Sequence, residues 1–490
     1  MNLFAADMRQ RSAVLLIGVF VLTGFALRCF AAQGGLWTDE AWSLLYAQQA
    51  GDALGVLTRI NHDNNHHLNS WWLQLVGPEA PPILMRGLSI ITSSITIWVA
   101  ALIGLRRNRM TGVIAAALFA LSPIMVVYGS EARGYAPMML SLIIMIWRID
   151  IWLGDRSAPK PTLLLASCAL AGTLAHLTML PAVIMLALWI FLAGVQRYGI
   201  IQSVKAAADV LGPALAIAIF CVSAVIITAT RSETGLQVGG YTSFEWSLFG
   251  GALAELLTLT TGVGYAAQAS IYAIIAIVTI GLAMLITAWQ MPVERKWFYT
   301  VLVLTMPVAV AVFNPGNSQY ARYYLPSAIA ILLLIAEWIG HVAIGQTRAK
   351  IGVMTILAGI SGLALVQNYQ LITSQRGHPE QALAAIMRAA PKGAGITISL
   401  ERAHAMLKVA ALSQHYPLRI SQAKCSTADF HFAPRSAIEA PLPMLRSCGP
   451  SMRLIAFGNA IGPSGESWSL YQRQALPRPI AAVSSAPSRQ

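Results

Sequence analysis

Hydrophobic residues gather along this chain in long runs that are separated by short polar stretches. A helix needs about 20 mostly apolar residues to cross a bilayer. One apolar stretch, residues 246–264, does not fit this pattern, because Glu255 and several glycines interrupt it. It predicts an interfacial or re-entrant helix. The pattern predicts a polytopic α-helical membrane protein with about 11 to 13 transmembrane helices. Eleven runs approach or exceed the required length, at residues 12–32, 82–105, 110–128, 135–153, 161–176, 178–195, 206–229, 267–289, 297–313, 323–345 and 351–373.

Basic residues concentrate in every second connection between these runs. Short cytoplasmic loops accumulate Lys and Arg, so this alternation predicts the orientation of the chain. The N-terminus is expected in the cytoplasm and the C-terminus outside. The residues concerned are Arg9 and Arg11, then Arg106, Arg107 and Arg109, Arg148 with Arg156 and Lys160, Arg197 with Lys205, Arg295 with Lys296, and Arg348 with Lys350.

The composition agrees with a membrane protein. Of 490 residues, 56% are hydrophobic and only 11% are charged, which is too apolar for a soluble protein of this size. The formal net charge of +13 is divided among membrane loops, so it gives no support to nucleic-acid binding. We therefore expect membrane lipids, and no nucleic acid, among the partners.

Three parts are expected along the chain. Residues 1–373 form the transmembrane body, and within it residues 33–81 form a long first external loop with interfacial helices. Residues 376–476 alternate helix and strand patterns and predict a small extracytoplasmic α/β domain. Residues 477–490 are rich in Pro and Ser and are expected to be disordered. Cys425 and Cys448 lie in the external domain, where an oxidising compartment would permit a disulfide.

The strongest chemical candidates are Asp39 and Glu40, which follow the first apolar run directly. A carboxylate pair is costly in hydrocarbon, so this position indicates a water-facing site at the membrane surface. Adjacent residues on a helix point about 100° apart, so the two would serve different partners. We predict both as catalytic residues. The alternative is that Asp39 caps the interfacial helix by accepting from free backbone N–H groups.

A second polar cluster occupies residues 61–70, before two tryptophans. His66 and His67 are candidates for contact with a sugar or a phosphate, and Asp63 and Asn65 for support of an acceptor or of the loop. His66 with Glu40 is a possible metal pair, but the spacing in this cluster matches no closed zinc site.

Three arginines lie on the predicted external side, against the charge bias: Arg86, Arg133 and Arg322. A guanidinium grips a phosphate bidentately, so anionic ligands are expected there. The motifs around the last two add Glu131, Tyr135 and Tyr323 as candidate donor-binding residues. Ordinary interfacial anchoring by Arg and Tyr is the alternative for either motif alone.

Together these motifs resemble the GT-C superfamily of membrane glycosyltransferases. The resemblance rests on Asp39-Glu40, on the histidine-rich end of the first loop, and on the motifs Glu131-Ala132-Arg133-Gly134-Tyr135 and Arg322-Tyr323-Tyr324-Leu325-Pro326. The branch it is most similar to is the protein O-mannosyltransferase and aminoarabinose transferase group. Relatives commonly have a His-Pro-Pro-Leu type segment where this chain has His66-His67-Leu68-Asn69.

The resemblance implies transfer of a sugar, with inversion, from a polyprenyl-phosphate donor to a lipid, glycan or protein acceptor outside the cytoplasmic membrane. A bacterial inner membrane is the expected location. A transporter or flippase of a lipid-linked sugar remains an alternative, because it also needs external arginines and a polar cavity. A glycan polymerase or ligase is a further alternative that shares the compartment but would require a longer donor saccharide.

Overall fold

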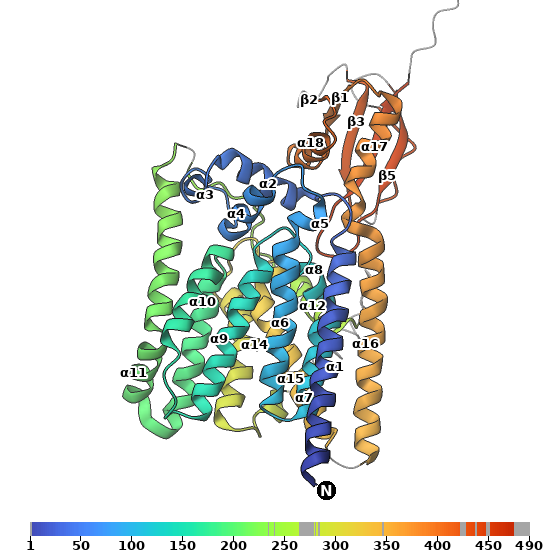
Figure 1. Ribbon diagram of the computed structural model, residues 1–490. Helices are drawn as coiled ribbons and strands as arrows, with labels where there is room; N and C mark the ends of the chain where they lie inside the picture. The colour runs from blue at the N-terminus through green and yellow to red at the C-terminus, as the bar shows by residue number, and fades with distance from the viewer. Residues whose placement is uncertain are drawn as a thin grey trace, which may run out of the picture.

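The computed structural model describes residues 2–233, 235–239, 241–263, 279, 281–282, 285–344, 347–421, 428–436, 439–446 and 451–474. A tall helical body carries a cap of short helices at one end, and a small sheet domain stands beside that cap (Figure 1). The N-terminus lies at the opposite end of the body. This arrangement confirms the predicted class of a helical membrane protein with a C-terminal α/β domain.

Seven helices within the described residues are long and apolar enough to cross a membrane. One of them, α11, breaks at Gly199, whose φ of 74° is non-helical, and so joins two predicted runs. The predicted run at 267–289 falls mostly outside the described residues. The helices of the body are α1 (Asn2–Ala31), α6 (Gly87–Leu105), α7 (Arg109–Leu121), α8 (Pro123–Tyr128), α9 (Tyr135–Gly154), α10 (Thr162–Ala175), α11 (Met179–Arg231), α12 (Trp246–Thr261), α14 (Val293–Phe313), α15 (Leu325–Val342) and α16 (Thr347–Ser374).

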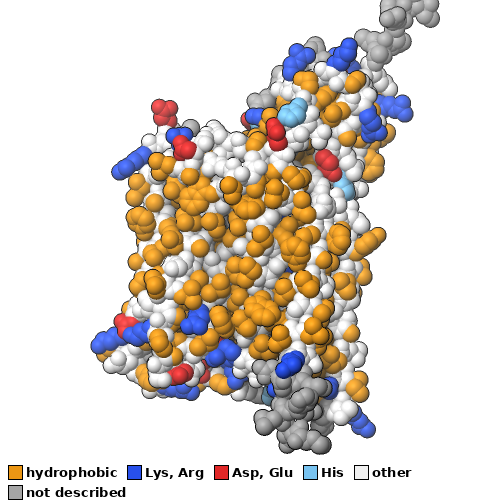
Figure 2. Space-filling view, in the orientation of Figure 1, with side chains coloured by type: hydrophobic (Ala, Val, Ile, Leu, Met, Phe, Trp, Pro, Cys, Tyr) orange, Lys and Arg blue, Asp and Glu red, His pale blue; other side chains and the backbone are white. Residues whose placement is uncertain are grey.

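The surface of the body is a broad apolar belt, and charged side chains gather at its two ends (Figure 2). Leu22, Leu163 and Phe220 each expose more than two thirds of their surface. A soluble protein rarely exposes apolar patches of this extent, whereas lipid solvates them at no cost. The chain is an integral membrane protein.

The helix that contains α7 and α8 is interrupted at Pro123, shortly before the loop 129–134. Pro123 cannot donate a backbone hydrogen bond, so the helix stops after α7 and restarts as α8. The freed carbonyls are satisfied by side chains: Arg28 donates to those of Phe119 and Ala120, and Asn368 donates to that of Leu121. The loop 129–134 then connects α8 to α9.

The first external loop covers this end of the body with four helices (Figure 1). They are α2 (Thr38–Ala50), α3 (Ala53–Thr58), α4 (His67–Val76) and α5 (Pro82–Met85). α3 begins after Asp52, a short polar residue whose side chain accepts from the free backbone N–H of Gly55 at 2.6 Å. These four helices lie in the loop where interfacial helices are predicted.

The C-terminal domain is a six-stranded sheet in the order β2-β1-β3-β6-β5-β4. β1 lies next to the edge strand and pairs parallel with β2 and β3, and the remaining neighbours pair antiparallel. Cys425, Cys448 and residues 477–490 lie outside the described residues. The elements are α17 (Pro379–Ala389), β1 (Ala394–Ile398), α18 (His404–Ser413), β2 (Leu418–Ser421), β3 (Phe430–Arg435), β4 (Met444–Arg446), β5 (Ser451–Gly458) and β6 (Ser467–Arg473).

Predicted cytoplasmic arginines meet in an ion-pair cluster between the ends of several helices. Arg107 bridges Asp150 of α9 at 2.6 Å and Glu337 of α15 at 3.4 Å, while Arg106 also contacts Asp150 and Arg295 contacts Glu337. Both carboxylates are almost fully buried, so the cluster ties four segments of the body together.

Candidate active site

A cavity of about 650 Å³ opens between the first external loop, the loop before α9, the 3-10 turn η1 (Ala321–Tyr324) and the C-terminal domain. Segments that are distant in sequence therefore supply its walls, and residues 176–178 between α10 and α11 also line it. The predicted site residues that line it are Asp39, Asp63, Asn65, His66, Arg133, Tyr135, Arg322 and Tyr323.

The centre of the cavity is a carboxylate between two guanidinium groups. Asp39 Oδ2 lies 2.9 Å from Arg133 Nη1 and 3.4 Å from Arg322 Nη1. The arginine side chains are 6% and 14% exposed, whereas that of Asp39 is 29% exposed. Two buried cations thus share one partly accessible anion, and the group carries a net positive charge.

Local structure fixes the position of Asp39. It lies in the first turn of α2, where the free N–H groups and the helix dipole favour a negative charge. Asn64 joins it to the arginine, since its Nδ2 donates to the Asp39 carbonyl and its Oδ1 accepts from Arg133 Nη2, both at 2.7 Å. The capping alternative for Asp39 finds no side-chain cap: its carboxylate points to the arginines.

Aromatic rings surround both guanidinium groups. Arg322 stacks over Tyr320 at 4.1 Å and lies 5.6 Å from Tyr323, and Arg133 lies 5.0 Å from the ring of Tyr135. These contacts hold the cations rigidly in the cavity wall. Within the described residues, Nε of Arg133 and Nε of Arg322 are buried without a hydrogen-bond partner.

Histidines form the next part of the wall. His66 stacks on His176 with 4.8 Å between ring centres, and His176 lies 4.5 Å from Tyr135. Burial, reinforced by the neighbouring Arg133, holds the pKa of His66 well below its usual value. The ring is therefore neutral at pH 7, and its buried Nε2 has no partner among the described residues. It can hydrogen-bond a neutral hydroxyl without adding charge.

Glu40 lies behind the cavity instead of lining it. Its oxygens accept from Arg86 at 2.6 and 2.8 Å and from the backbone N–H of Ala132 at 2.8 Å, and the side chain is fully buried. Burial opposes its ionisation, but Arg86 and Arg376 together with these hydrogen bonds lower the pKa of Glu40. Arg86 also donates to the carbonyls of residues 32–35. The pair fastens α2 to the body.

Glu131 and His67 also lie outside the lining. Glu131 is fully buried and accepts from Ser464 of the C-terminal domain. Burial raises the pKa of its carboxyl, although Arg133 and Arg376 oppose the change. His67 begins α4, and burial lowers its pKa to about 4. Both residues support the walls.

Asp63 and Asn65 shape the loop at the cavity rim. Asp63 pairs with His62 at 2.8 Å, and Asn65 donates to the carbonyls of Val56 and Ile60. Within the described residues, no group of three or more His, Cys, Asp or Glu side chains is placed to hold a metal ion. The possible pair of His66 and Glu40 does not fit a metal, because the Glu40 oxygens are already occupied by its cationic and backbone donors.

No family model matches this chain, and no curated protein matches it. Solved structures do match. ArnT from Cupriavidus metallidurans in the apo state has a TM-score of 0.57 and 12% identity, over 94% of this chain and 98% of that chain. The same protein bound to undecaprenyl phosphate gives a TM-score of 0.53 and 13% identity, over 93% and 97%. This chain has the GT-C fold. At such low identity the match establishes the architecture, body and C-terminal domain together.

Several residues that line the cavity were not predicted from the sequence. Asn64 belongs to the polar cluster of the first loop, but only its neighbours Asp63, Asn65, His66 and His67 were predicted as site residues. His176 ends an apolar run, and a histidine at that position is the signal that could have identified it. Leu400, Glu401 and Arg402 reach the cavity from the C-terminal domain, and no motif marks them.

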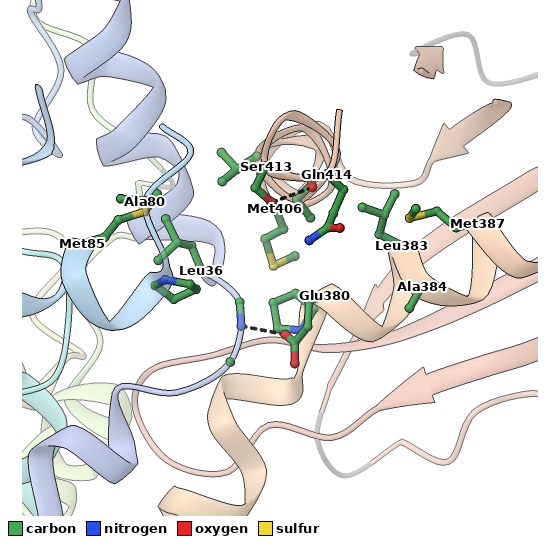
Figure 3. A pocket seen from close by; sticks show the side chains of 16 residues that line it. Leu36, Ala80, Met85, Glu380, Leu383, Ala384, Met387, Met406, Ser413 and Gln414 are labelled. Carbon is green, nitrogen blue, oxygen red and sulfur yellow. Dashed lines mark hydrogen bonds between the residues drawn. The ribbon is translucent and has the colours of Figure 1, made fainter. Parts of the chain in front are cut away.

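A second cavity, of about 630 Å³, lies between the C-terminal domain and the segments 34–36 and 80–85. Figure 3 shows Leu383, Met387 and Met406 around it, and Glu380 accepting from the backbone N–H of Gly35 at 2.7 Å. Its lining is largely apolar, so it suits neither a phosphate nor a sugar. It is a seam between the domain and the body.

Proposed function

We propose that this protein is an inverting glycosyltransferase that moves a sugar from a polyprenyl-phosphate donor to an acceptor hydroxyl at the outer face of the cytoplasmic membrane. The chain would lie in a bacterial inner membrane, with its N-terminus in the cytoplasm and its C-terminal domain outside. The observation that carries the proposal is the cluster of Asp39, Arg133 and Arg322 in one cavity at the end of an apolar body.

Asp39 is the base in the proposed reaction. Its partly exposed carboxylate takes the proton of the acceptor hydroxyl as that oxygen attacks the anomeric carbon. The bond between this carbon and the phosphate oxygen breaks on the opposite face, and its electron pair leaves with the polyprenyl phosphate. The configuration at the anomeric carbon is therefore inverted, and no covalent enzyme intermediate forms.

Arg133 and Arg322 stabilise the departing phosphate. Negative charge develops on the leaving oxygen, and two fixed guanidinium groups in a partly dehydrated wall interact with it strongly. Removal of one such donor typically costs about 100- to 1,000-fold in rate. The lipid chain of the donor would follow the apolar surface of the body, where side chains are already solvated by lipid.

The neutral histidines and tyrosines beside the arginines are suited to the sugar. His66 and Tyr135 offer hydrogen bonds and a ring face without a charge that would compete with the phosphate. Glu40, Arg86 and Glu131 hold the walls from behind. Their contribution to turnover is through position only.

The test is transfer from a defined polyprenyl-phosphate sugar by the full-length protein in detergent or liposomes, with mass spectrometry of the products. Asp39→Asn should fold normally and lose about 100- to 10,000-fold in rate. Asp52→Asn, which removes an exposed acid from the same loop, is the matched control. Normal turnover by Asp39→Asn would refute the role of the base. Movement of the donor across the membrane without cleavage would favour the transporter alternative.

A further inference from the structure

Asp39 cannot act as the base and as the ion-pair partner of Arg133 and Arg322 at the same time. A base must present a free lone pair to the acceptor, yet the carboxylate is held between Arg133 and Arg322 at 2.9 and 3.4 Å. Those are also the groups proposed to grip the donor phosphate. Within the described part of the chain, Asp39 is the only acid in ion-pair contact with either arginine.

The arginines fit a phosphate better than they fit the carboxylate. A guanidinium has five N–H donors, and a carboxylate has only two oxygens to share between the two groups. Nε of Arg133 and Nε of Arg322 are buried without a partner. A phosphate ester brings more oxygens and more charge than a carboxylate, and would therefore pair with the Nη groups that face the cavity more strongly than Asp39 does.

We propose that Asp39 acts as an internal anion that occupies the donor-phosphate subsite of the empty enzyme, and that donor binding displaces it from the arginines. This inference rests on the proposed function. The displaced carboxylate stays beside the cavity, since Asn64 still holds its backbone carbonyl and Arg133. Once it is released from the arginines, the carboxylate has its lone pairs free to accept the proton of the acceptor hydroxyl. Binding of the donor thereby switches on the base, and the donor binds first.

The test is the affinity of purified full-length protein for undecaprenyl phosphate in detergent, measured by intrinsic tryptophan fluorescence or thermophoresis. Asp39→Asn removes the competing anion and should bind about tenfold more tightly than the wild type, while it loses transfer. Asp52→Asn should leave the affinity within about twofold, because Asp52 pairs with Arg59 away from the cavity.

A second variant changes the charge in the opposite direction. Asn64→Asp places another carboxylate against Arg133 with nearly the same shape, although it loses the hydrogen bond that Asn64 Nδ2 donates to the Asp39 carbonyl, and it should weaken binding by about tenfold. It keeps the arginine paired, so it provides an answer even if Asp39→Asn does not fold.

The outcomes distinguish a failure of the displacement proposal from a failure of the proposed glycosyltransferase function. Unchanged or weaker binding by folded Asp39→Asn, or unchanged binding by Asn64→Asp, would overturn the displacement, while the wild type still binds and transfers. A wild type that does not bind undecaprenyl phosphate would overturn the proposed function itself.

Discussion

Glu40 provides the sharpest test of how the site is divided between chemistry and support. The sequence predicts it as a catalytic residue, yet the structure buries it completely against Arg86, with Arg376 Nε at 4.0 Å. We therefore expect Glu40→Ala to destabilise the protein by about 3–5 kcal/mol, because it leaves a buried guanidinium without its counter-charge. Glu40→Gln should cost less, since an amide oxygen can still accept from Arg86 and from the backbone of Ala132.

Thermal and denaturant unfolding in detergent, followed by tryptophan fluorescence, measures this loss, and the transfer rate per folded molecule is measured in parallel. Glu40→Gln should keep most of the rate of the wild type, whereas Asp39→Asn should lose it. The double variant Glu40→Gln with Arg86→Gln should be less destabilised than the sum of the single changes, since the two side chains are in direct contact. Full stability of Glu40→Gln together with loss of transfer would show that Glu40 takes part in the reaction, and would refute the supporting role.

Three further outcomes are expected. Arg322→Gln should lower transfer by about 100-fold, with Arg109→Gln at the other end of the body as the unaffected control, and equal rates for the two would contradict the assignment. The pKa of His67 is about 4 in the folded protein, below the unfolded value of about 6.5, so the unfolded chain binds more protons between these values. Stability should therefore fall as pH drops from about 6.5 towards 4, and a melting series with His67→Gln should show a shallower fall. Gly377→Ala should loosen the C-terminal domain and speed its proteolysis, because φ is 91° and the new Cβ would lie 2.5 Å from the Glu466 carbonyl oxygen; Gly359→Ala, which has open space, should not.

The membrane body was predictable because a spanning helix must be apolar over a fixed length, and this pattern is local in the sequence. The grouping of Asp39 with Arg322, 283 positions apart, followed from topology, since each polar motif adjoins the same face of the membrane. Sequence did not decide which of Asp39 and Glu40 faces the cavity. Both residues lie in the first turn of α2. Which of them faces the cavity depends on the position of Arg86, and that position is set by tertiary packing and not by the local sequence.

The C-terminal domain shows the same division. Its helices and first strand were predictable from periodicity, near Pro379–Ala389 and Ala394–Ile398. Its contribution of residues 400–402 to the cavity was not, because docking depends on buried polar contacts between distant segments, such as Thr38 donating to Glu466 at 2.5 Å.

Arg376 is the second residue beyond α16, and its side chain returns into the body to donate to the carbonyls of Ala31 and Ser130 at 2.6 and 2.7 Å. The junction between the membrane body and the C-terminal domain therefore places a side chain in the interior of the body. If the C-terminal domain were exchanged between relatives at this junction, Arg376 could be lost, and the carbonyls of Ala31 and Ser130 would lose their hydrogen-bond donor. A successful chimera must keep Arg376 with the membrane half.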